Sequence, residues 1–539
     1  MTATRATNYL QGLSDNIVVD PRKCIFCAKC VDTCILDNLR LQLAPCRQEC
    51  PLHTNCQGYV QLIARGEDEK AMAVLAEALP FPGIVGRVCS HPCESACNRR
   101  DVDGEAVSIR DLKRYLADNV GLPAVEVAPD RPEKVAVVGA GPAGAMASYL
   151  LRKDGFQVDL YDANERPGGM LATGVPEFRL PVEVLDKEMD ILSQLGVRLH
   201  LGQAVGPDLP LASLVEGHDA VLLATGAQKS KKLGVEGEEL AGVHGGLEFL
   251  RQARTKAKPA LGRKVVVIGG GNTAVDAAQT AYRLGADAVT LVCLEARGEM
   301  PAFAWEVADA CEEGIAIQNS WGPVRLLGTG GKVNGVELRR CVRVFDSAGR
   351  FAPAYDDADR KQIRADTVVV AIGQDADLSL LSGLVGQVGN RLAVDALTLQ
   401  AEGQAKVFAA GDAVTGPKTV VEALAAGQQA AESIKRYLAG DDLRYGRSYL
   451  GPYETDFAVD TSKAVQRPRV AVRKAEGAAR RSFAELQQGM SAEEARAEAE
   501  RCLSCGEVYG KHRTCWFCLP CEIECPEDAL WVDIPYLLR

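Results

Sequence analysis

Two stretches of the chain combine an apolar strand, a glycine-rich turn and a helix in the same order. In residues 133–165, an apolar run is interrupted by glycines, continues with helical periodicity and leads to a second strand. Residues 263–295 repeat this order about 130 residues later. Such βαβ units build parallel sheets, so the predicted fold class is α/β with two Rossmann-like domains.

Outside these units the hydrophobic pattern predicts shorter elements. Residues 16–20 predict a short strand, and residues 57–79 have helical periodicity. Residues 440–480 are polar and lose periodicity, which indicates a linker or a wrapping segment. Ser491-Ala-Glu-Glu494 has the form of a capping box and predicts the start of a short helix.

Composition and charge narrow the class of protein. A chain of 539 residues predicts three or four domains, and its 47% hydrophobic and 25% charged residues are typical of globular proteins. The net charge of −11 argues against a nucleic-acid surface or a polybasic membrane patch. The N-terminus lacks a secretory pattern, and the longest apolar run, residues 135–151, is too short and glycine-rich to span a bilayer. We therefore expect a cytoplasmic protein without membrane insertion or a nucleic-acid partner.

The first glycine turn, residues 139–144, follows a strand and opens a helix. Gly139 permits the tight turn, Gly141 lets the backbone approach a pyrophosphate, and Gly144 allows close helix packing. The next strand ends in Asp162, which is placed for ribose hydroxyls. A lone glycine fingerprint is often an ordinary turn, but here strand, helix and acid agree. The predicted dinucleotide-binding residues are Gly139, Gly141, Pro142, Ala143, Gly144 and Asp162.

The second glycine turn, residues 269–274, has two glycines and an alanine in the same three roles. Its second strand ends at Glu295, and an acid there accepts ribose hydroxyls and repels a 2′-phosphate. This site is therefore predicted to prefer NAD(H) over NADP(H), although Arg297 lies two residues further on. The predicted residues are Gly269, Gly271, Asn272, Thr273, Ala274 and Glu295.

The cysteines are clustered near the two ends of the chain. Of 19, 16 lie in residues 24–97 or 502–525. Clustered cysteines in a cytosolic chain of this size indicate metal rather than disulfides. Cys293, Cys311 and Cys341 lie in the long middle without a C-x2-C or C-x4-C spacing, and we interpret them as ordinary buried thiols.

Two cysteine runs have the spacing of bacterial ferredoxins, and three close thiolates of such a run bind one 4Fe–4S cube while the fourth binds another. The runs are Cys24, Cys27, Cys30, Cys34 and Cys515, Cys518, Cys521, Cys525. Zinc is the alternative, but structural zinc usually uses two separated pairs. We hypothesise that the two ends fold as one split ferredoxin module, in which Cys525 completes the first set and Cys34 the second. A swap between two protomers, or cubes ligated within each run, are the alternatives.

Eight short motifs follow one another along the chain. They are Gly86-Arg-Val-Cys89, Cys93-Glu-Ser-Ala-Cys97, Gly168-Gly-Met170, Gly174-Val-Pro-Glu-Phe-Arg-Leu-Pro181, Ala224-Thr-Gly226, Gly269-Gly-Gly-Asn-Thr-Ala-Val-Asp276, Glu299-Met-Pro-Ala302 and Phe408-Ala-Ala-Gly-Asp412. With them, residues 46–437 resemble the small (β) subunit of glutamate synthase and its relatives. These are flavoproteins that pass electrons between a nicotinamide and iron–sulfur clusters.

The resemblance implies that the first fold binds FAD and that the second, inserted in it, binds the nicotinamide. Asp412 is expected to bond the ribityl chain, and Thr419 and Val420 to offer backbone N–H groups to the flavin ring. Relatives that use NADPH usually carry a basic pair where this chain has Leu294 and Glu295, which supports NADH. The further FAD-binding residues implied are Gly168, Gly169, Met170, Thr225, Gly226 and Gly411.

The resemblance also implies a helical domain that carries two more cubes. In the family it begins with an Arg-Cys-x2-Cys-Gly segment, which here stands near the other end, at residues 501–506. By analogy, one cube is expected on Cys46, Cys97, Cys502 and Cys505, and the other on Cys50, Cys56, Cys89 and Cys93. Sixteen cysteines thus predict about four cubes.

The predicted domain boundaries follow from these motifs. They are 1–45 for the N-terminal ferredoxin-type segment, 46–125 for the helical double-cluster domain, 126–227 with 376–440 for the FAD domain, 228–375 for the inserted NAD(H) domain, 441–500 for the linker or wrapping segment and 501–539 for the C-terminal ferredoxin-type segment.

The predicted function is that of an NADH oxidoreductase with FAD and 4Fe–4S clusters. Hydride transfer between stacked rings requires no catalytic side chain, and none is predicted. Because no segment predicts a pocket for an organic substrate, the other redox partner is expected to be a catalytic subunit or a ferredoxin. The alternatives are a non-catalytic electron-distribution module, an NADPH-dependent glutamate synthase small subunit and a stand-alone reductase.

Overall fold

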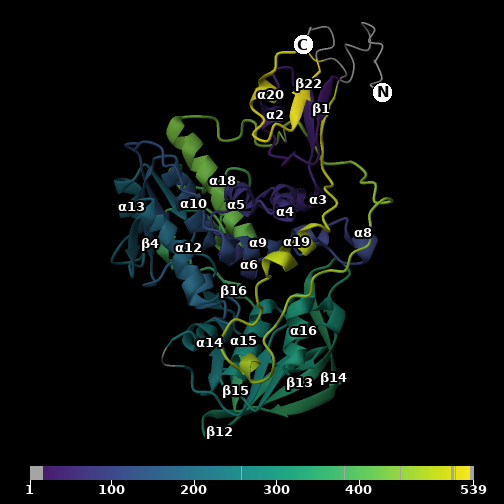
Figure 1. Cartoon of the computed structure of the whole chain (residues 1–539). Coiled ribbons are helices and arrows are strands. Elements are labelled where there is room, and N and C mark those ends of the chain that lie inside the picture. The colour runs from purple at the N-terminus through teal and green to yellow at the C-terminus, as the bar shows by residue number, and fades with distance from the viewer. Residues whose placement is uncertain are drawn as a thin grey trace. The chain divides into compact units, whose positions relative to one another are not determined.

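The computed structural model describes residues 16–255, 258–381, 383–449, 451–511, 515 and 517–533 (Figure 1). It contains two compact units. Unit 1 comprises the described parts of Met1–Ala124, Arg444–Arg473 and Gly489–Arg539, and unit 2 comprises those of Val125–Leu443 and Lys474–Gln488. Residues 1–15 and 534–539 of the predicted terminal segments lie outside the described residues. No described helix has the length and apolarity that crossing a membrane requires.

The two ends of unit 1 form a small module of short strands and helices. Its elements are β1 (Ile17–Val19), α2 (Lys29–Asp32), β2 (Leu39–Gln42), β20 (Tyr453–Glu454), β21 (Val508–Gly510), α20 (Pro520–Ile523) and β22 (Leu530–Val532). Strand β1 pairs antiparallel with β22, and β2 pairs antiparallel with β21 and parallel with β20. The prediction that the two chain ends fold together is confirmed.

The rest of unit 1 is helical. Its helices are α3 (Pro45–Gln48), α4 (Cys56–Arg65), α5 (Asp68–Ala76), α6 (Pro82–Val88), α7 (Pro92–Ser95), α8 (Arg100–Asp103), α9 (Ile109–Asn119) and α19 (Ala492–Ala499). The periodicity predicted in residues 57–79 belongs to two helices, because Gly66 adopts φ +76° and ends α4. The predicted capping box starts α19: Ser491 accepts from the N–H of Glu494, and its own N–H donates to the Glu494 carboxylate.

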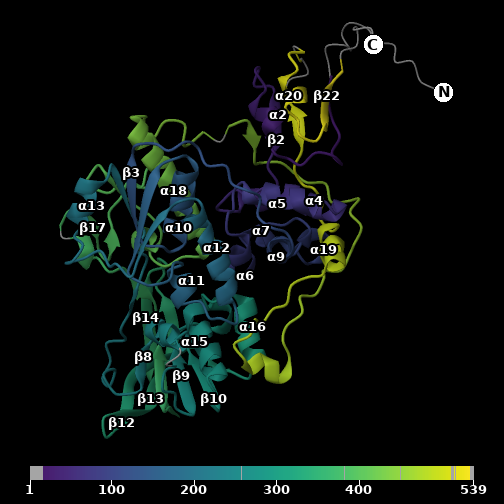
Figure 2. The ribbon, with the colours of Figure 1, turned by 60° about the vertical axis from the view of Figure 1, so that its left-hand side comes forward.

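Unit 2 contains two five-stranded parallel sheets, as the α/β fold class predicts. The first has the order β19-β6-β3-β4-β5. Its elements are β3 (Lys134–Val138), α10 (Pro142–Lys153), β4 (Gln157–Asp162), α11 (Met170–Thr173), α12 (Val182–Gln194), β5 (Arg198–Leu201), α13 (Leu211–Gly217), β6 (Ala220–Leu223), β17 (Gln387–Val388), β18 (Arg391–Leu392), β19 (Val407–Ala409), α17 (Asp412–Thr415) and α18 (Val420–Ala439). Helices α10 and α18 lie side by side over this sheet (Figures 1 and 2).

The second sheet has the order β11-β10-β9-β15-β8, and a three-stranded antiparallel sheet, β12-β13-β14, follows β11 in the chain. The elements are β8 (Val243–Gly245), α14 (Gly246–Ala253), β9 (Lys264–Ile268), α15 (Asn272–Arg283), β10 (Ala288–Val292), η1 (Arg297–Glu299), α16 (Ala304–Glu312), β11 (Ala316–Gln318), β12 (Trp321–Thr329), β13 (Lys332–Phe345), β14 (Phe351–Arg364) and β15 (Thr367–Val370).

The second sheet is inserted in the first along the chain. Two connections link them, and they pair antiparallel through β7 (Lys229–Ser230) and β16 (Gln374–Asp375), shortly before η2 (Ser379–Leu381). The crossing points lie close to the predicted boundaries of 228–375. The remaining part of unit 2, Lys474–Gln488, contains the short helix η3 (Gly477–Arg481).

Candidate flavin, dinucleotide and iron–sulfur sites

The first glycine turn has the geometry that a bound pyrophosphate requires. A Cβ on Gly139, whose φ is +108°, would lie 2.3 Å from the carbonyl oxygen of Ala224. One on Gly144 would lie 1.9 Å from the carbonyl oxygen of Gly139. A Cβ added to Gly141, in contrast, would lie 3.9 Å from its nearest neighbour, the Cα of Gly169. Gly141 therefore leaves open space beside the N-terminus of α10, which suits an anion.

A cavity of about 400 Å³ extends from this turn. Asp162 lies in its wall, and its carboxylate accepts the N–H of Ala140 at 2.7 Å. Two of the predicted residues, Gly144 and Gly168, do not line the cavity. Gly144 allows close packing against Gly139, and Gly168 adopts a turn with φ +118°. The predicted residues that line the cavity are Gly139, Gly141, Pro142, Ala143, Asp162, Gly169, Met170, Thr225, Gly226, Gly411, Asp412, Thr419 and Val420.

Asp412 and the start of α18 form another wall of this cavity. Burial raises the pKa of Asp412 to about 6, and its carboxylate accepts the N–H of Lys418 at 3.1 Å. The expectation for Thr419 is wrong in one respect, because its N–H donates to the Glu422 carboxylate at 3.0 Å. Val420, as the first residue of α18, has no helical partner for its N–H.

Two polar residues that sequence reasoning missed, Gln228 and Arg251, line the cavity from the inserted domain. Arg251, on α14, donates to the Gln228 side chain at 3.3 Å. Its Nε is buried and has no hydrogen-bond partner among the described residues. An unpartnered cationic nitrogen in this position fits a bound diphosphate. No spacing in the sequence could reveal it, since α14 follows the fingerprint by about 100 residues.

The second glycine turn repeats this geometry. Gly269 has φ +145°, and a Cβ there would lie 2.2 Å from the carbonyl oxygen of Ala371. A Cβ added to Gly271, in contrast, would meet no described atom within 4 Å, and Ala274 is fully buried. The first residues of α15, Asn272 and Thr273, follow at once, so this turn also fits a pyrophosphate.

Glu295 lies three residues beyond the end of β10 and faces the second turn. A Cβ added to Gly270 would lie 2.5 Å from its Oε2, so the carboxylate is close to the turn. The side chain of Arg297 instead donates to the Cys311 sulfur at 3.3 Å. The acid, rather than the arginine, is therefore the group beside the dinucleotide turn.

Cysteines from both chain ends line one small cavity in the terminal module: Cys24, Cys27, Cys30 and Cys525. Burial raises the pKa of Cys24 to about 11, so binding of iron must displace a proton there. Burial, and to a smaller extent the nearby Cys34, raise the pKa of the Cys521 thiol to about 11. Both chain ends therefore contribute cysteines to this cavity.

A second cavity lies in the helical part of unit 1. It is lined by Cys46, Cys56, Cys97, Cys502 and Cys505. Cys56 also contacts Cys50 and Cys93, so it lies between the two predicted sets. No three described His, Cys, Asp or Glu side chains lie close enough together to hold a single metal ion. The arrangement around cavities fits the larger 4Fe–4S cube, which binds cysteines at its corners.

A buried ion pair brings the late Arg-Cys-x2-Cys segment to this cavity. Arg501 is 1% exposed; it donates to the Glu498 carboxylate at 2.6 Å and to the carbonyl oxygen of Ala106 at 2.8 Å. Glu498 also accepts the N–H of Ser108 at 2.8 Å. Residues 105–108 precede α9, so the pair joins the C-terminal segment to the helical domain, which lacks this motif at its own start.

The three middle cysteines form no redox pair. All are free thiols; Cys293 and Cys341 are buried as expected, whereas Cys311 is exposed. The described part of the chain therefore offers no disulfide beside the flavin cavity.

The two dinucleotide-binding folds and the cysteine-rich helical part define a class of protein, the flavin- and nicotinamide-dependent oxidoreductases with iron–sulfur domains. Residues 133–427 match the family model of the pyridine nucleotide-disulphide oxidoreductases. Residues 4–122 match the dihydropyrimidine dehydrogenase domain II, 4Fe-4S cluster. The chain belongs to the pyridine nucleotide-disulphide oxidoreductase family.

Several relatives share most of the chain. The NADP(+)-dependent formate dehydrogenase subunit beta of Moorella thermoacetica is 39% identical over 86% of this chain and 71% of that protein. The NADPH-Fe(3+) oxidoreductase subunit beta of Geobacter sulfurreducens is 36% identical over 86% and 75%. The glutamate synthase [NADPH] small chain of Halomonas elongata is 33% identical over 73% and 88%. The resemblance to glutamate synthase small subunits is confirmed.

A solved structure has the same fold at lower identity. FprA of Mycobacterium tuberculosis, in complex with NADPH, superposes with a TM-score of 0.51 over 57% of this chain and 85% of that chain, at 20% identity. It supports the paired dinucleotide-binding fold of unit 2.

Proposed function

We propose that this chain is the electron-transfer subunit of a larger redox enzyme, which exchanges hydride with NAD(H) at FAD and moves single electrons through four 4Fe–4S clusters. The observation that carries the proposal is the presence, in one chain, of two open dinucleotide turns and sixteen cysteines gathered near its ends. FAD takes up an electron pair as hydride, and iron–sulfur cubes take up single electrons. The chain binds and orients these groups.

The proposed ligand sets keep the assignment made from the sequence, so Cys56, which lies between two sets, is grouped with Cys50 and Cys93. Four sets of four are assigned: Cys24, Cys27, Cys30, Cys525; Cys34, Cys515, Cys518, Cys521; Cys46, Cys97, Cys502, Cys505; and Cys50, Cys56, Cys89, Cys93. Protein prepared without oxygen should contain about 16 iron and 16 sulfide per chain, four of each per cube. About eight of each, or zinc in place of iron, would contradict the proposal.

The proposed nicotinamide is NADH, although the relatives above are named for NADP(+) or NADPH. The carboxylate of Glu295 beside the turn supports this choice, because it would repel a 2′-phosphate. Comparing kcat/KM for the two reduced nicotinamides tests it. We expect the wild type to prefer NADH. Glu295→Arg should shift the ratio of kcat/KM values at least about tenfold toward NADPH, which corresponds to about 1.4 kcal/mol. The surface variant Asp287→Asn should leave this ratio unchanged. A wild type that prefers NADPH would contradict this choice.

The proposed partner is a catalytic redox subunit or a ferredoxin. The formate dehydrogenase and Fe(3+) oxidoreductase relatives are each named as a subunit beta. Anaerobic purification of the native complex tests this, because a partner subunit should co-purify in a fixed ratio.

The glutamate synthase relative, covered over 88% of its length, favours a second candidate function as the small subunit of that enzyme. Glutamine-dependent oxidation of the nicotinamide by the purified complex would support this candidate over the others.

A further inference from the structure

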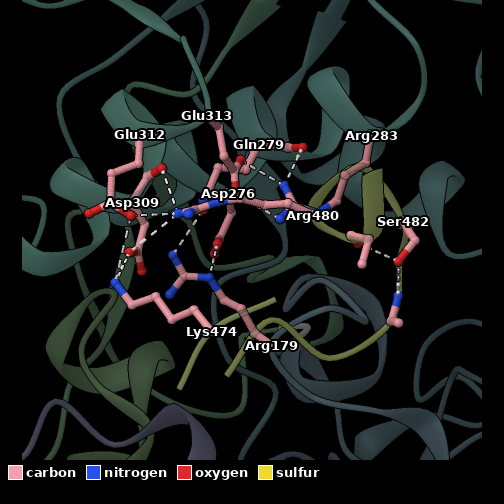
Figure 3. Close-up of polar contacts among 12 residues, drawn as sticks. Arg179, Asp276, Gln279, Arg283, Asp309, Glu312, Glu313, Lys474, Arg480 and Ser482 are labelled. Carbon is pink, nitrogen blue, oxygen red and sulfur yellow. Dashed lines mark hydrogen bonds and ion pairs between the residues drawn. The ribbon is translucent and has the colours of Figure 1, made fainter. Parts of the chain in front are cut away.

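One motif of the resemblance, residues 174–181, joins the flavin cavity to the nicotinamide domain. At its start, Val175 lines the cavity, and its carbonyl oxygen accepts a hydrogen bond from Arg254 at the end of α14. Four residues on, Nε of Arg179 lies 2.6 Å from Oδ1 of Asp276 on α15 (Figure 3). Its Nη1 donates to Glu306 on α16. The segment therefore contacts the flavin site with one end and two helices of the inserted domain with the other.

These two helices begin at the second dinucleotide turn. Asp276 lies about one turn after Asn272, the first residue of α15. The Asn272 side chain also accepts the N–H of Phe303, which precedes α16, at 3.1 Å. A displacement of Arg179 would therefore be transmitted to the start of both helices, where the nicotinamide dinucleotide is proposed to bind.

Residues 474–488, which we call the strap, close over this junction. The strap folds back on itself through the N–H of Ala475 and the carbonyl oxygen of Leu486, 2.8 Å apart. The N–H of Leu486 in turn donates to the carbonyl oxygen of Phe178, at 2.8 Å. On its other side, Lys474 pairs with Asp309. The strap thus holds both the neighbour of Arg179 and helix α16.

The strap also balances the charge of the junction. The acids gathered there are Asp276, Glu306, Asp309, Glu312 and Glu313, and the domains themselves supply the cations Arg179 and Arg283 (Figure 3). Arg480 of the strap pairs with Glu312 at 2.8 Å and with the fully buried Glu313 at 3.4 Å. Without the two strap cations, five carboxylates would face two arginines, and mutual repulsion would loosen the helices.

We propose that Arg179 is a positioning residue for hydride transfer: with the strap, it fixes the nicotinamide-binding domain in one orientation against the flavin cavity. The proposal rests on the proposed function for its kinetic consequence, but the fixed orientation itself does not depend on it. Arg179 touches none of the reacting atoms and acts through α15 and α16.

Stopped-flow reduction of the FAD-loaded full chain by NADH, without oxygen, tests the kinetic part. For Arg179→Gln we expect the limiting rate to fall about tenfold or more, since misplacement by about 1 Å costs on the order of 100-fold. The NADH concentration at half-maximal rate and the FAD content should stay near their wild-type values. Arg179→Lys should restore part of the rate, because it keeps the charge.

Hydrogen exchange tests the orientation without any turnover. Amide exchange in α15 and α16 should accelerate in Arg179→Gln, and less strongly in Arg480→Gln, whereas Glu476→Gln, an exposed residue of the strap, should behave as wild type. Unchanged exchange together with an unchanged limiting rate in Arg179→Gln would overturn the proposal. If NADH fails to reduce the wild-type flavin, the proposed function fails, and the exchange data alone decide on the orientation.

Discussion

Asp412 carries a buried carboxyl into the flavin cavity. Burial raises its pKa to about 6 from an ordinary 3.8, so in the protein without FAD it gains a proton below about pH 6. A ribityl hydroxyl that donates to the carboxylate stabilises the charged form and lowers this pKa, so FAD binding releases a proton. We expect FAD affinity to rise on the order of tenfold as the pH increases from 5 to 7, because one pKa unit corresponds to about 1.4 kcal/mol.

Fluorescence titration of the apoprotein with FAD at several pH values measures this dependence. In Asp412→Asn, which cannot ionise, the affinity should be flat over the same range. Tighter binding at pH 5 than at pH 7 in the wild type would show that the neutral acid donates the hydrogen bond instead.

Arg251 offers an unpartnered nitrogen to the same cavity. We expect Arg251→Met to release FAD roughly 10–100-fold faster, because a hydrogen bond to a charged group contributes about 1.5–3 kcal/mol. The measurement is the rate of flavin fluorescence recovery on dilution. Arg263→Met, which removes an exposed cation of the same domain, serves as the control and should leave the rate unchanged.

Among single residues, the sequence predicted those whose role depends on neighbours a few positions away in the chain. The glycines of both turns have the packing and open space that their fingerprints predict, since each role is set within a few residues. Arg251 was missed because its place in the cavity depends on how an inserted domain packs. The N–H of Thr419 was expected to face the flavin ring, but it donates to the Glu422 carboxylate in a capping box.

At the end of α19, the buried ion pair between Glu498 and Arg501 holds the segment that carries Cys502 and Cys505. We expect Glu498→Gln to destabilise unit 1 and to lower the iron content by about four per chain, because removing one partner of a buried ion pair costs about 3–5 kcal/mol and Arg501 positions Cys502. Anaerobic thermal unfolding and iron analysis measure these effects.

The matched control is Glu500→Gln on the same segment. Its ion pair with Arg467 is about half exposed at both side chains, so its loss should change stability by only about 0.5 kcal/mol. Equal effects of the two variants would contradict the role given to the buried pair.

Helices marked by a short sequence motif were predictable, whereas the residues at which helices end were predicted less well. The capping box of Ser491 gave the start of α19 correctly. The helical pattern of residues 57–79 did not reveal that α4 ends at Gly66, because both helices bury apolar residues at helical spacing.

For the whole molecule, the distinctive feature is a small module made from both ends of the chain, which is proposed to bind two clusters. If Cys525 completes the first set, Cys525→Ser should expose Cys24, Cys27 and Cys30 to alkylation while the second run stays protected. Mass spectrometry after anaerobic alkylation measures this. Labelling of Cys515, Cys518 and Cys521 instead would show that each run binds its own cube.

The sequence could predict this module, because ferredoxin spacing demands a fourth ligand from another run. It predicted a linker or wrapping segment over residues 441–500, but not the contacts of the strap within it, which are made with charges, an aromatic ring and backbone groups on distant elements. Long-range ion pairs of this kind leave no local pattern.

In the proposed function, an electron pair enters at the flavin and leaves as single electrons through the clusters. The most direct measurement is an anaerobic titration of the cluster-loaded protein with NADH, followed by visible absorption and electron paramagnetic resonance. We expect the flavin absorption to bleach and signals of reduced 4Fe–4S clusters to appear in the same titration. A flavin that stays oxidised, or one that bleaches while every cluster remains oxidised, would contradict it.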